Sequence, residues 1–451
     1  MRTSLLFFYA SITSSIAFWQ VHNKKNADSC FCQLSGQVDD CCCTIDDVHQ
    51  LNSIHIYPRL QNVVRRNYFR YIKLKLHRKC PFWSDHYQCA LKDCSVDKCS
   101  EDELPPGLKN NHMFNNTMKE KPCSVSDAEQ LLGDVDTTIS PDRKESLEAW
   151  SNYDADKSFC VDLEEDAEDA DWIDLLLNPE QYTGYRGESP HRIWNSIYKE
   201  NCFLPEKKMR THNDFNALFL SRTCFEKRVF YRLVSGLHTS INIHLSYKYL
   251  LSDPRLPTKP YWGPNLNEFQ KRFNLEKTNG KGPHWLKNLY FTYLLTLRAV
   301  TKAAPYWKEA VFFTGDEKED KEVKQIILEL IKSSKTCRST FDEGLMFTDE
   351  TQNLNEEFRL HYQNITRIMD CVGCEKCRLW GKLQTYGIGT ALKILFSSDN
   401  WEDIPVLDGK KFFLSRTEIV ALFNALNKLS SSIHMVNEFK KINEKRKKKE
   451  L

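Results

Sequence analysis

Apolar residues recur every three or four positions from about residue 171 onward, a spacing that places them on one face of a helix. Ser415 and Glu418 form a capping-box pattern at the start of the last such segment. No alternation of strands and helices and no internal repeat is evident. The pattern therefore predicts a mainly α fold with a helical core over residues 171–451. The segments with the clearest spacing are RIWNSIYKENCF, RVFYRLVSGLHTSINIHLSYKYLL, HWLKNLYFTYLLTLRAVTKAA, KEVKQIILELIKSS and TEIVALFNALNKLSSSIHMVNEFKKI.

The part of the chain before residue 171 lacks this periodicity. Residues 23–48 hold two cysteine clusters around a turn rich in Gly and Asp, which predicts a small disulfide-stapled hairpin. Residues 80–123 combine cysteines with Asp, Pro, Gly and Asn and predict a surface loop. Residues 124–170 are polar and acidic and predict a poorly ordered connection. We expect one domain over residues 23–451, with the disulfide-rich extension packed on the helical core.

Residues 1–22 have the organisation of a secretory signal peptide. Arg2 supplies a positive start, an apolar run extends from Leu5 to Phe18, and Ser15-Ile16-Ala17 is a small-residue cleavage pattern. The run is shorter than the ~20 apolar residues of a membrane-spanning helix, and no later segment qualifies as a span. The sequence predicts a soluble mature protein in the secretory route.

The composition agrees with that route. The chain has 17 cysteines, most of which pair in an oxidising compartment, and because the number is odd at least one has no partner. Two glycosylation sequons, at Asn115 and Asn364, fit the same compartment. The 63 basic and 61 acidic side chains nearly cancel, so no overall charge points to nucleic acid. The final KKINEKRKKKEL is a basic run typical of a solvated helix end.

The stretch CVGCEKC places cysteines at positions 371, 374 and 377. An iron–sulfur run of this type continues to a fourth cysteine, but here Arg378 follows, and a zinc site would need further ligands from elsewhere. Lys376 and Arg378 place positive charge beside Cys377, which favours its thiolate. Spacing and compartment favour a redox-active pair, and a structural disulfide and a metal site remain the alternatives.

A second group, Cys89, Cys94 and Cys99, has equal short spacing in the predicted loop. Thiols so placed can form alternative disulfides by exchange, and a static loop clamp is the alternative reading. An acidic loop containing Pro and Gly is a poor element to brace, which favours a moving segment. The cluster Cys30, Cys32, Cys41, Cys42 and Cys43 and the pair Cys202 and Cys224 are interpreted as structural. Cys160 and Cys337 have no evident partners.

A dithiol that cycles must pass its electrons on, and a flavin or quinone would accept them. The dinucleotide fingerprint is absent, because Gly387-Ile388-Gly389 lacks the third glycine and a preceding strand. A flavin would therefore be held in a helical bundle by aromatic stacking and by cations that pair with phosphate. The sequence candidates are the Trp194 helix, the segment Ser235 to His238, and Arg272.

Several longer stretches together resemble the endoplasmic reticulum oxidoreductin family and cover nearly the whole mature chain. They are CFCQLSGQVDDCCC, CPFWSDHYQCALKDC, NPEQYTGYRG, IWNSIYKENCF, FYRLVSGLHTSINIHLS, WGPNLNEFQKRF and CVGCEKCRLWGKLQTYGIGTALKILF. The resemblance implies an FAD-dependent thiol oxidase of the endoplasmic reticulum lumen. Such an enzyme re-oxidises protein disulfide isomerase, reduces dioxygen to hydrogen peroxide and supports oxidative protein folding. The resemblance further implies a monomer without bound metal, and it leaves peripheral membrane association open.

Residue by residue, Cys89 and Cys94 match the family's shuttle pair, which accepts electrons from the isomerase. Cys374 and Cys377 match the pair beside the flavin. Because Cys94 and Cys374 are 280 positions apart (374 minus 94), the shuttle segment is expected to fold back over the bundle.

The resemblance also implies the roles of the other cysteines. Cys99 and Cys123 match regulatory partners that capture Cys94 and Cys89 and switch the shuttle off. The implied structural bridges are Cys30–Cys43, Cys32–Cys41, Cys80–Cys371 and Cys202–Cys224. The cysteines left over are Cys42, Cys160 and Cys337.

The family's FAD contacts match Thr183, Trp194, Ser235, His238 and Arg272. Trp194 and His238 would stack on the cofactor, and Arg272 would pair with phosphate. Gln181 and Trp285 stand where animal members typically carry arginine. From the residues alone, two other classes remain as alternatives: a secreted, disulfide-stabilised binding protein without catalysis, and a metal-binding protein.

Overall fold

The fold is mainly helical. The computed structural model describes residues 31, 34–41, 43–80, 82, 94–109, 170–180, 188–200, 225–253, 256–334, 341–347, 352–397, 406–407 and 410–450. The predicted signal peptide, and all of the 124–170 connection except residue 170, lie outside these ranges. Helices dominate the described residues, and the strands among them are few and short. The predicted mainly α fold is confirmed.

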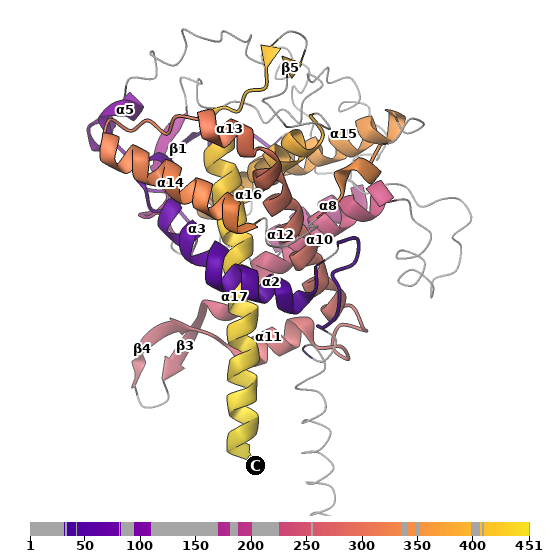
Figure 1. The fold of residues 1–451 in the computed structure, drawn as a ribbon. Helices are drawn as coiled ribbons and strands as arrows, with labels where there is room; N and C mark the ends of the chain where they lie inside the picture. The colour runs from indigo at the N-terminus through magenta and orange to yellow at the C-terminus, as the bar shows by residue number, and fades with distance from the viewer. Residues whose placement is uncertain are drawn as a thin grey trace, which may run out of the picture.

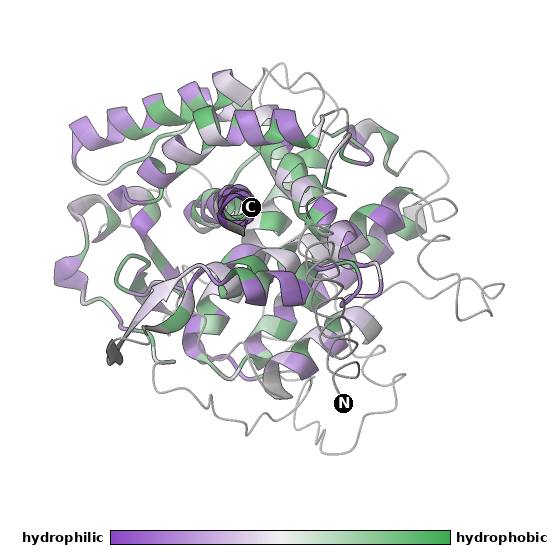
Figure 2. Ribbon diagram, turned by 90° about the horizontal axis from the view of Figure 1, so that it is seen from below, coloured by the Kyte–Doolittle hydropathy of each residue, from purple (hydrophilic) through white to green (hydrophobic). Residues whose placement is uncertain are grey.

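Four long helices form the centre of the molecule. They are α10 (Phe225–Tyr247), α12 (Gly282–Lys302), α16 (Glu375–Leu395) and α17 (Arg416–Glu450). α16 packs along α17 and α10 along α12, and α17 also contacts α10 and α12. Gly387 permits the close α16–α17 contact, because a Cβ there would lie 2.3 Å from the Ala421 carbonyl oxygen. Figure 1 shows α17 passing through the body and projecting below it, and Figure 2 shows the other helices around it.

Shorter helices cover this centre. They are α2 (Ile45–Leu51), the π-helix η1 (Asn52–Ile56), α3 (Tyr57–Val63), α4 (Asn67–Arg70), α5 (Pro106–Lys109), α8 (Glu188–Glu200), α11 (Leu266–Phe273), α13 (Ala304–Glu309), α14 (Glu317–Ser334) and α15 (Gln352–Ile368). The 3₁₀ turns are η2 (Glu101–Glu103), η5 (Glu343–Leu345) and η6 (Met369–Cys371). Apolar side chains of the N-terminal helices and of the central helices belong to one continuous core. The helical periodicity in the sequence therefore corresponds to inward faces that share this core.

The start of α17 follows the predicted capping box. Ser415 N–H donates to the Glu418 carboxylate at 2.8 Å, and Glu418 N–H donates to Ser415 Oγ at 3.1 Å. These two bonds satisfy backbone donors that have no partner within the helix. They fix where α17, the longest helix among the described residues, begins.

Three antiparallel strand pairs complete the described fold. β1 (Tyr71–Leu74) pairs with β2 (Asp171–Asp174), β3 (Tyr249–Asp253) with β4 (Leu256–Gly263), and β5 (Val406–Leu407) with β6 (Lys410–Lys411). The helical pattern was expected to begin near residue 171, but this segment is a strand. Four residues are too few to show a helical period, and pairing with β1 determines their conformation.

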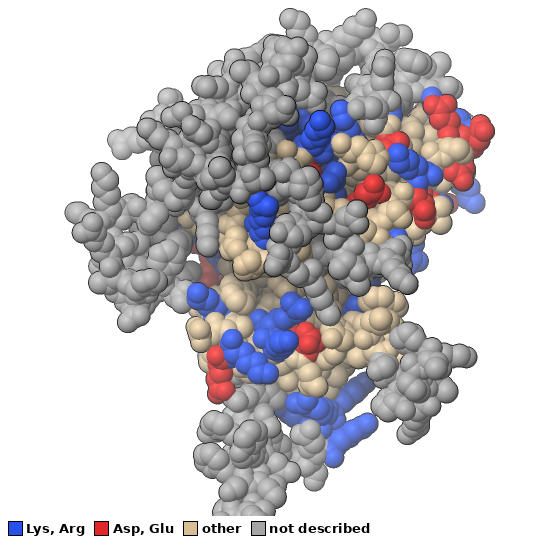
Figure 3. Space-filling view, turned by 180° about the vertical axis from the view of Figure 1, so that it is seen from behind, with Lys and Arg blue, Asp and Glu red and all other residues tan. Residues whose placement is uncertain are grey.

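No helix in the described part of the chain is apolar enough along its length to cross a membrane. Lysine and arginine side chains gather where α17 projects from the body (Figure 3), and the exposed ones include Lys440, Lys441, Lys445, Lys448 and Lys449. The basic run of the sequence is thus the last part of a helix, as expected.

Candidate functional site

The first cysteine of the triplet is part of a structural bridge. Cys371 ends the turn η6 and forms a disulfide with Cys80, 291 positions earlier in the chain. This is the bridge that the resemblance implies. Arg378 supports the same loop, since its Nε donates to the Val372 carbonyl oxygen at 2.9 Å and its Nη1 to that of Leu76.

The other two cysteines lie at the start of α16. Cys374 is the N-cap residue and Cys377 lies in the first turn. Both side chains are buried, and both cysteines are present as thiols. The N-terminus of a helix carries partial positive charge, which favours a thiolate in this position.

A buried lysine adds positive charge near the pair. Lys428 of α17 forms an ion pair with Glu180, and both side chains are 6% exposed. Burial lowers the pKa of Lys428 to about 8, and the charges of Glu180 and Cys377 act in the opposite direction. Since a thiolate at Cys377 favours the ammonium form of Lys428, the ammonium equally favours that thiolate.

The segment that contains Cys94 docks against the same helix end. Lys376 N–H donates to the Cys94 carbonyl oxygen at 3.0 Å, and Val96 N–H donates to Glu375 Oε2 at 3.0 Å. The expected return of the shuttle segment over the bundle is therefore present, at the two residues between Cys374 and Cys377.

Asn178 and β2 hold the same segment from its other side. Asp97 N–H donates to Asn178 Oδ1 and Asn178 Nδ2 donates to the Asp97 carbonyl oxygen, both at 2.8 Å. Cys99 N–H donates to the Trp172 carbonyl oxygen at 2.8 Å. The Asn178 side chain thus pairs with the Asp97 backbone as an adjacent strand would. The backbone carbonyl oxygen of Asn178 in turn accepts a hydrogen bond from Trp380 Nε1 at 2.9 Å.

Cys94 and Cys99 are in different states. Cys94 is disulfide-bonded, whereas Cys99 is a thiol, so the regulatory pairing of Cys94 with Cys99 is not formed. Burial, followed by the nearby Asp174 carboxylate, raises the pKa of the Cys99 thiol. Cys99 is therefore a weak nucleophile in this conformation. Cys89 and Cys123, the other two members of the predicted switch, lie outside the described residues.

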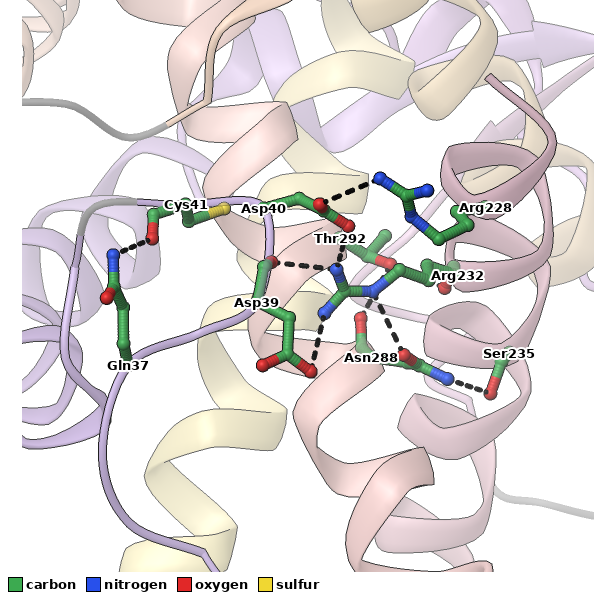
Figure 4. Close-up of polar contacts among 9 residues, drawn as sticks. All are labelled: Gln37, Asp39, Asp40, Cys41, Arg228, Arg232, Ser235, Asn288 and Thr292. Atoms are coloured by element: carbon green, nitrogen blue, oxygen red, sulfur yellow. Dashed lines mark hydrogen bonds and ion pairs between the residues drawn. The ribbon is translucent and has the colours of Figure 1, made fainter. Parts of the chain in front are cut away.

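The N-terminal cluster is only partly described. Cys43 is disulfide-bonded, and the expected Cys32–Cys41 bridge stays a prediction because Cys32 lies outside the described residues. Cys41 follows Asp40, whose φ of 58° turns the chain so that this segment faces Arg232 on α10 (Figure 4). The remaining cysteines of the prediction lie outside the described residues, namely Cys30, Cys32, Cys42, Cys160, Cys202, Cys224 and Cys337.

Two aromatic candidates for the flavin site lie together. Trp194 of α8 and His238 of α10 stack with their ring centroids 3.8 Å apart and their planes 11° apart. Tyr198 Oη lies 3.1 Å from His238 Nδ1. Burial, with a smaller effect of Arg272, lowers the pKa of His238 to about 3, so the ring is neutral near pH 7.

Ser235 and Arg272 lie on the same side of α10. Ser235 is one turn before His238, and Asn242 is one turn after it. Arg272 of α11 reaches this face, because its Nη1 donates to Asn242 Oδ1 at 2.7 Å. Four of the five predicted FAD residues are therefore arranged along one helix face, while Thr183 and Gln181 lie outside the described residues.

The chemistry of these groups fits FAD. A planar aromatic pair suits a flavin or adenine ring, a guanidinium suits a pyrophosphate, and a buried hydroxyl can bond a polar edge of the cofactor. Trp285, at one of the two departures from the family pattern, is partly exposed near the start of α12 and brings no charge. By contrast, the described residues contain no group of three or more His, Cys, Asp or Glu side chains placed to bind a metal.

Sequence reasoning missed the residues that position these groups. Glu375 lies inside the quoted CVGCEKC stretch and Asn178 begins the quoted NPEQ stretch, but neither pattern shows which segment it contacts. Asn364, one of the two predicted glycosylation sites, is only 1% exposed within α15, so this conformation does not support a glycan there. Asn115 lies outside the described residues.

The chain is similar to a known protein family, to proteins of other organisms and to solved structures. The family model described as Endoplasmic Reticulum Oxidoreductin 1 matches residues 55–436. The Ero1-like protein of Drosophila melanogaster is 43% identical over 451 residues, covering 94% of this chain and 93% of that one. ERO1-like protein alpha of Homo sapiens is 44% identical over 439 residues, covering 92% of each chain. A solved structure of a cysteine-to-alanine double mutant of S. cerevisiae Ero1p matches with a TM-score of 0.57 and 30% identity, over 89% of this chain and 98% of that one.

Proposed function

Because the chain belongs to the endoplasmic reticulum oxidoreductin family, whose members are oxidoreductases in oxidative protein folding, we propose that it re-oxidises protein disulfide isomerase and passes the electrons through FAD to dioxygen. The product would be hydrogen peroxide. We place the protein in the endoplasmic reticulum lumen, as a monomer with residues 1–22 acting as signal peptide and residues 23–451 as one domain.

The main support for this proposal is that the segment containing Cys94 docks on the start of α16, where Cys374 and Cys377 lie. The carbonyl oxygen of Cys94 accepts a hydrogen bond from Lys376 N–H, two residues after Cys374. A disulfide relay needs its outer and inner cysteines to approach each other, and a fixed backbone contact supplies that approach.

The relay consists of two exchanges that each conserve electrons. The reduced isomerase attacks the Cys89–Cys94 disulfide and leaves as a disulfide, so Cys89 and Cys94 become thiols. A thiolate of that pair then attacks the oxidised Cys374–Cys377 pair through a mixed disulfide, which reforms the outer disulfide and leaves two inner thiols. FAD held by Trp194, His238 and Arg272 would supply the two-electron acceptor that links the inner pair to dioxygen.

The geometry favours Cys94 and Cys374 as the two partners in the second exchange. The Cys94 backbone is bonded two residues from Cys374, at the start of α16. Cys377 lies in the first turn and near Lys428, whose positive charge stabilises its thiolate as the leaving group.

Oxygen consumption with reduced isomerase tests this function. Cys374→Ser and Cys89→Ser should each reduce the rate at least tenfold, because each breaks one exchange, while Cys337→Ser, outside the relay, should leave it near the wild-type rate. A wild-type rate of oxygen consumption in both Cys374→Ser and Cys89→Ser would contradict the proposal. Purified protein without flavin absorbance would instead favour a disulfide-stabilised binding protein.

A further inference from the structure

The Ser235 hydroxyl stands at the end of a chain of hydrogen bonds that begins in the N-terminal cysteine-rich turn. Asp39 and Asp40 contact Arg232 on α10, Arg232 contacts Asn288 on α12, and Asn288 contacts Ser235 (Figure 4). We propose that Asn288 is a positioning residue that fixes the Ser235 hydroxyl as a hydrogen-bond donor to FAD. This inference rests on the proposed function, because it takes FAD as the ligand.

Chemistry fixes the direction of each bond in this chain. Arg232 Nε donates to Asn288 Oδ1 at 3.2 Å, and because a guanidinium has no acceptor, the amide oxygen must face it. The amide nitrogen of Asn288 then faces Ser235 and donates to Oγ at 3.0 Å. Since an amide NH₂ accepts nothing, Ser235 must accept this bond, and its own proton points elsewhere. No acceptor for that proton occurs in the described part of the chain.

Arg232 cannot easily turn away from Asn288. Its Nη1 donates to the Asp39 carbonyl oxygen and to Asp40 Oδ2, each at 2.7 Å. Its guanidinium also lies 4.2 Å from the centroid of the Phe291 ring, and the side chain is only 5% exposed. A flipped Asn288 amide would place an NH₂ against this buried cation, which costs a hydrogen bond and adds repulsion.

The turn that binds Arg232 contains one residue, Asp40, in an uncommon backbone conformation. Asp40 has a left-handed φ of 58°, which is uncommon for a residue with a side chain. Its carboxylate is shared between two arginines, since Arg228 Nη2 lies 3.2 Å from the second oxygen. The contacts of the cysteine-rich turn with α10 therefore help to set the orientation of a group near the proposed cofactor.

A close helix contact brings Asn288 to Ser235. Gly236 lies against α12 so tightly that a Cβ there would be 2.0 Å from Thr292 Oγ1 and 2.7 Å from the Asn288 carbonyl oxygen. Ser235 is also three residues before His238, on the same face of α10. A fixed donor at this position matches FAD, whose ring carbonyls, ribityl oxygens and phosphates are all acceptors.

Replacing Asn288 with aspartate reverses the last bond without changing the shape of the side chain. The carboxylate of Asn288→Asp still accepts from Arg232, but it can only accept from Ser235, so the serine proton turns toward it. The dissociation constant for FAD should rise about tenfold, the size of one hydrogen bond at the upper end of its usual range. It is measured by quenching of FAD fluorescence on titration with deflavinated protein, and the melting temperature of that apoprotein should not fall.

A double-mutant comparison separates this role from a general effect of charge. Ser235→Ala should weaken FAD binding to a similar extent, and adding Asn288→Asp to it should change the dissociation constant less than twofold. Asn279→Asp, which adds the same charge in an exposed turn, serves as the control. Binding by Asn288→Asp within twofold of wild type, or losses that multiply in the double variant, would overturn the role of Asn288. A wild-type chain that binds no FAD would overturn the proposed function itself.

Discussion

Glu375 lies between the two cysteines of the CEKC motif, but its carboxylate contacts another segment of the chain. Oε2 accepts the Val96 N–H at 3.0 Å, and Oε1 lies 3.9 Å from His77 Nδ1. Solvent reaches this side chain, which is 34% exposed, so the bond contributes little to the free energy of unfolding. Its effect is to hold the backbone beside Cys94 at the start of α16.

Replacing Glu375 with leucine should therefore slow transfer from the isomerase without damaging the inner pair. A hydrogen bond to a partly exposed charged group supports a loss of about three- to tenfold in the rate of oxygen consumption with reduced isomerase. Flavin reduction by excess dithiothreitol, which does not need the shuttle, should stay near the wild-type rate. Glu375→Gln keeps a carbonyl acceptor and is the matched control. Equal losses with both reductants would contradict this role.

At the scale of elements, the contact between α10 and α12 decides how the proposed cofactor site is built. The two helices approach at Gly236, where side-chain and backbone atoms of α12 occupy the space of a Cβ. The neighbouring residues, Ser235 on one helix and Asn288 on the other, can bond only at this separation. The helix contact and the polar contact therefore depend on each other.

Gly236→Ala tests this dependence, because two effects of opposite sign compete. Alanine favours a helix over glycine by up to about 1 kcal/mol. Overpacking against the Asn288 backbone costs about 1–3 kcal/mol, so the steric effect should win and lower the free energy of unfolding. Urea denaturation should show a lower midpoint, together with weaker FAD binding. A midpoint above that of wild type would show that the helices separate at little cost.

At the scale of the whole molecule, several buried histidines make stability depend on pH. Burial lowers the pKa of His49 to about 4, of His238 to about 3 and of His361 to about 4. In the unfolded chain these groups titrate near pH 6.5. Between pH 6.5 and about 4 the unfolded state therefore binds protons that the folded state does not, and stability is lost as the pH falls through this window.

The expected loss is large compared with the stability of a typical domain. At pH 5 each of these histidines costs about 2 kcal/mol relative to pH 7.5, from the difference between its folded and unfolded pKa. Thermal unfolding should show a clearly lower melting temperature at pH 5 than at pH 7.5. His361→Gln should reduce that difference by roughly a quarter, because burial also lowers the pKa of His244. Equal melting temperatures at the two pH values would contradict neutral burial of these rings.

The sequence predicts the helices better than their contacts. The spacing of apolar residues identifies the central helices, and Ser415 with Glu418 marks the start of α17. Pairing between distant segments leaves no local signal, so the strand at residues 171–174 and the docking of Val96 on Glu375 were not predictable.

The bridge between Lys98 and Ile173 makes the shuttle segment a third, edge chain beside the β1–β2 ribbon. Register in such a ribbon is discrete: a slip of one residue moves a backbone by about 3.3 Å and turns every side chain to the opposite face. Cys94 is four residues from Lys98, so the pairing of Lys98 with Ile173, together with the bond from Lys376 N–H, limits where Cys94 can lie relative to α16. In the proposed relay, exchange between the two cysteine pairs would therefore depend on the register of this segment in whole-residue steps.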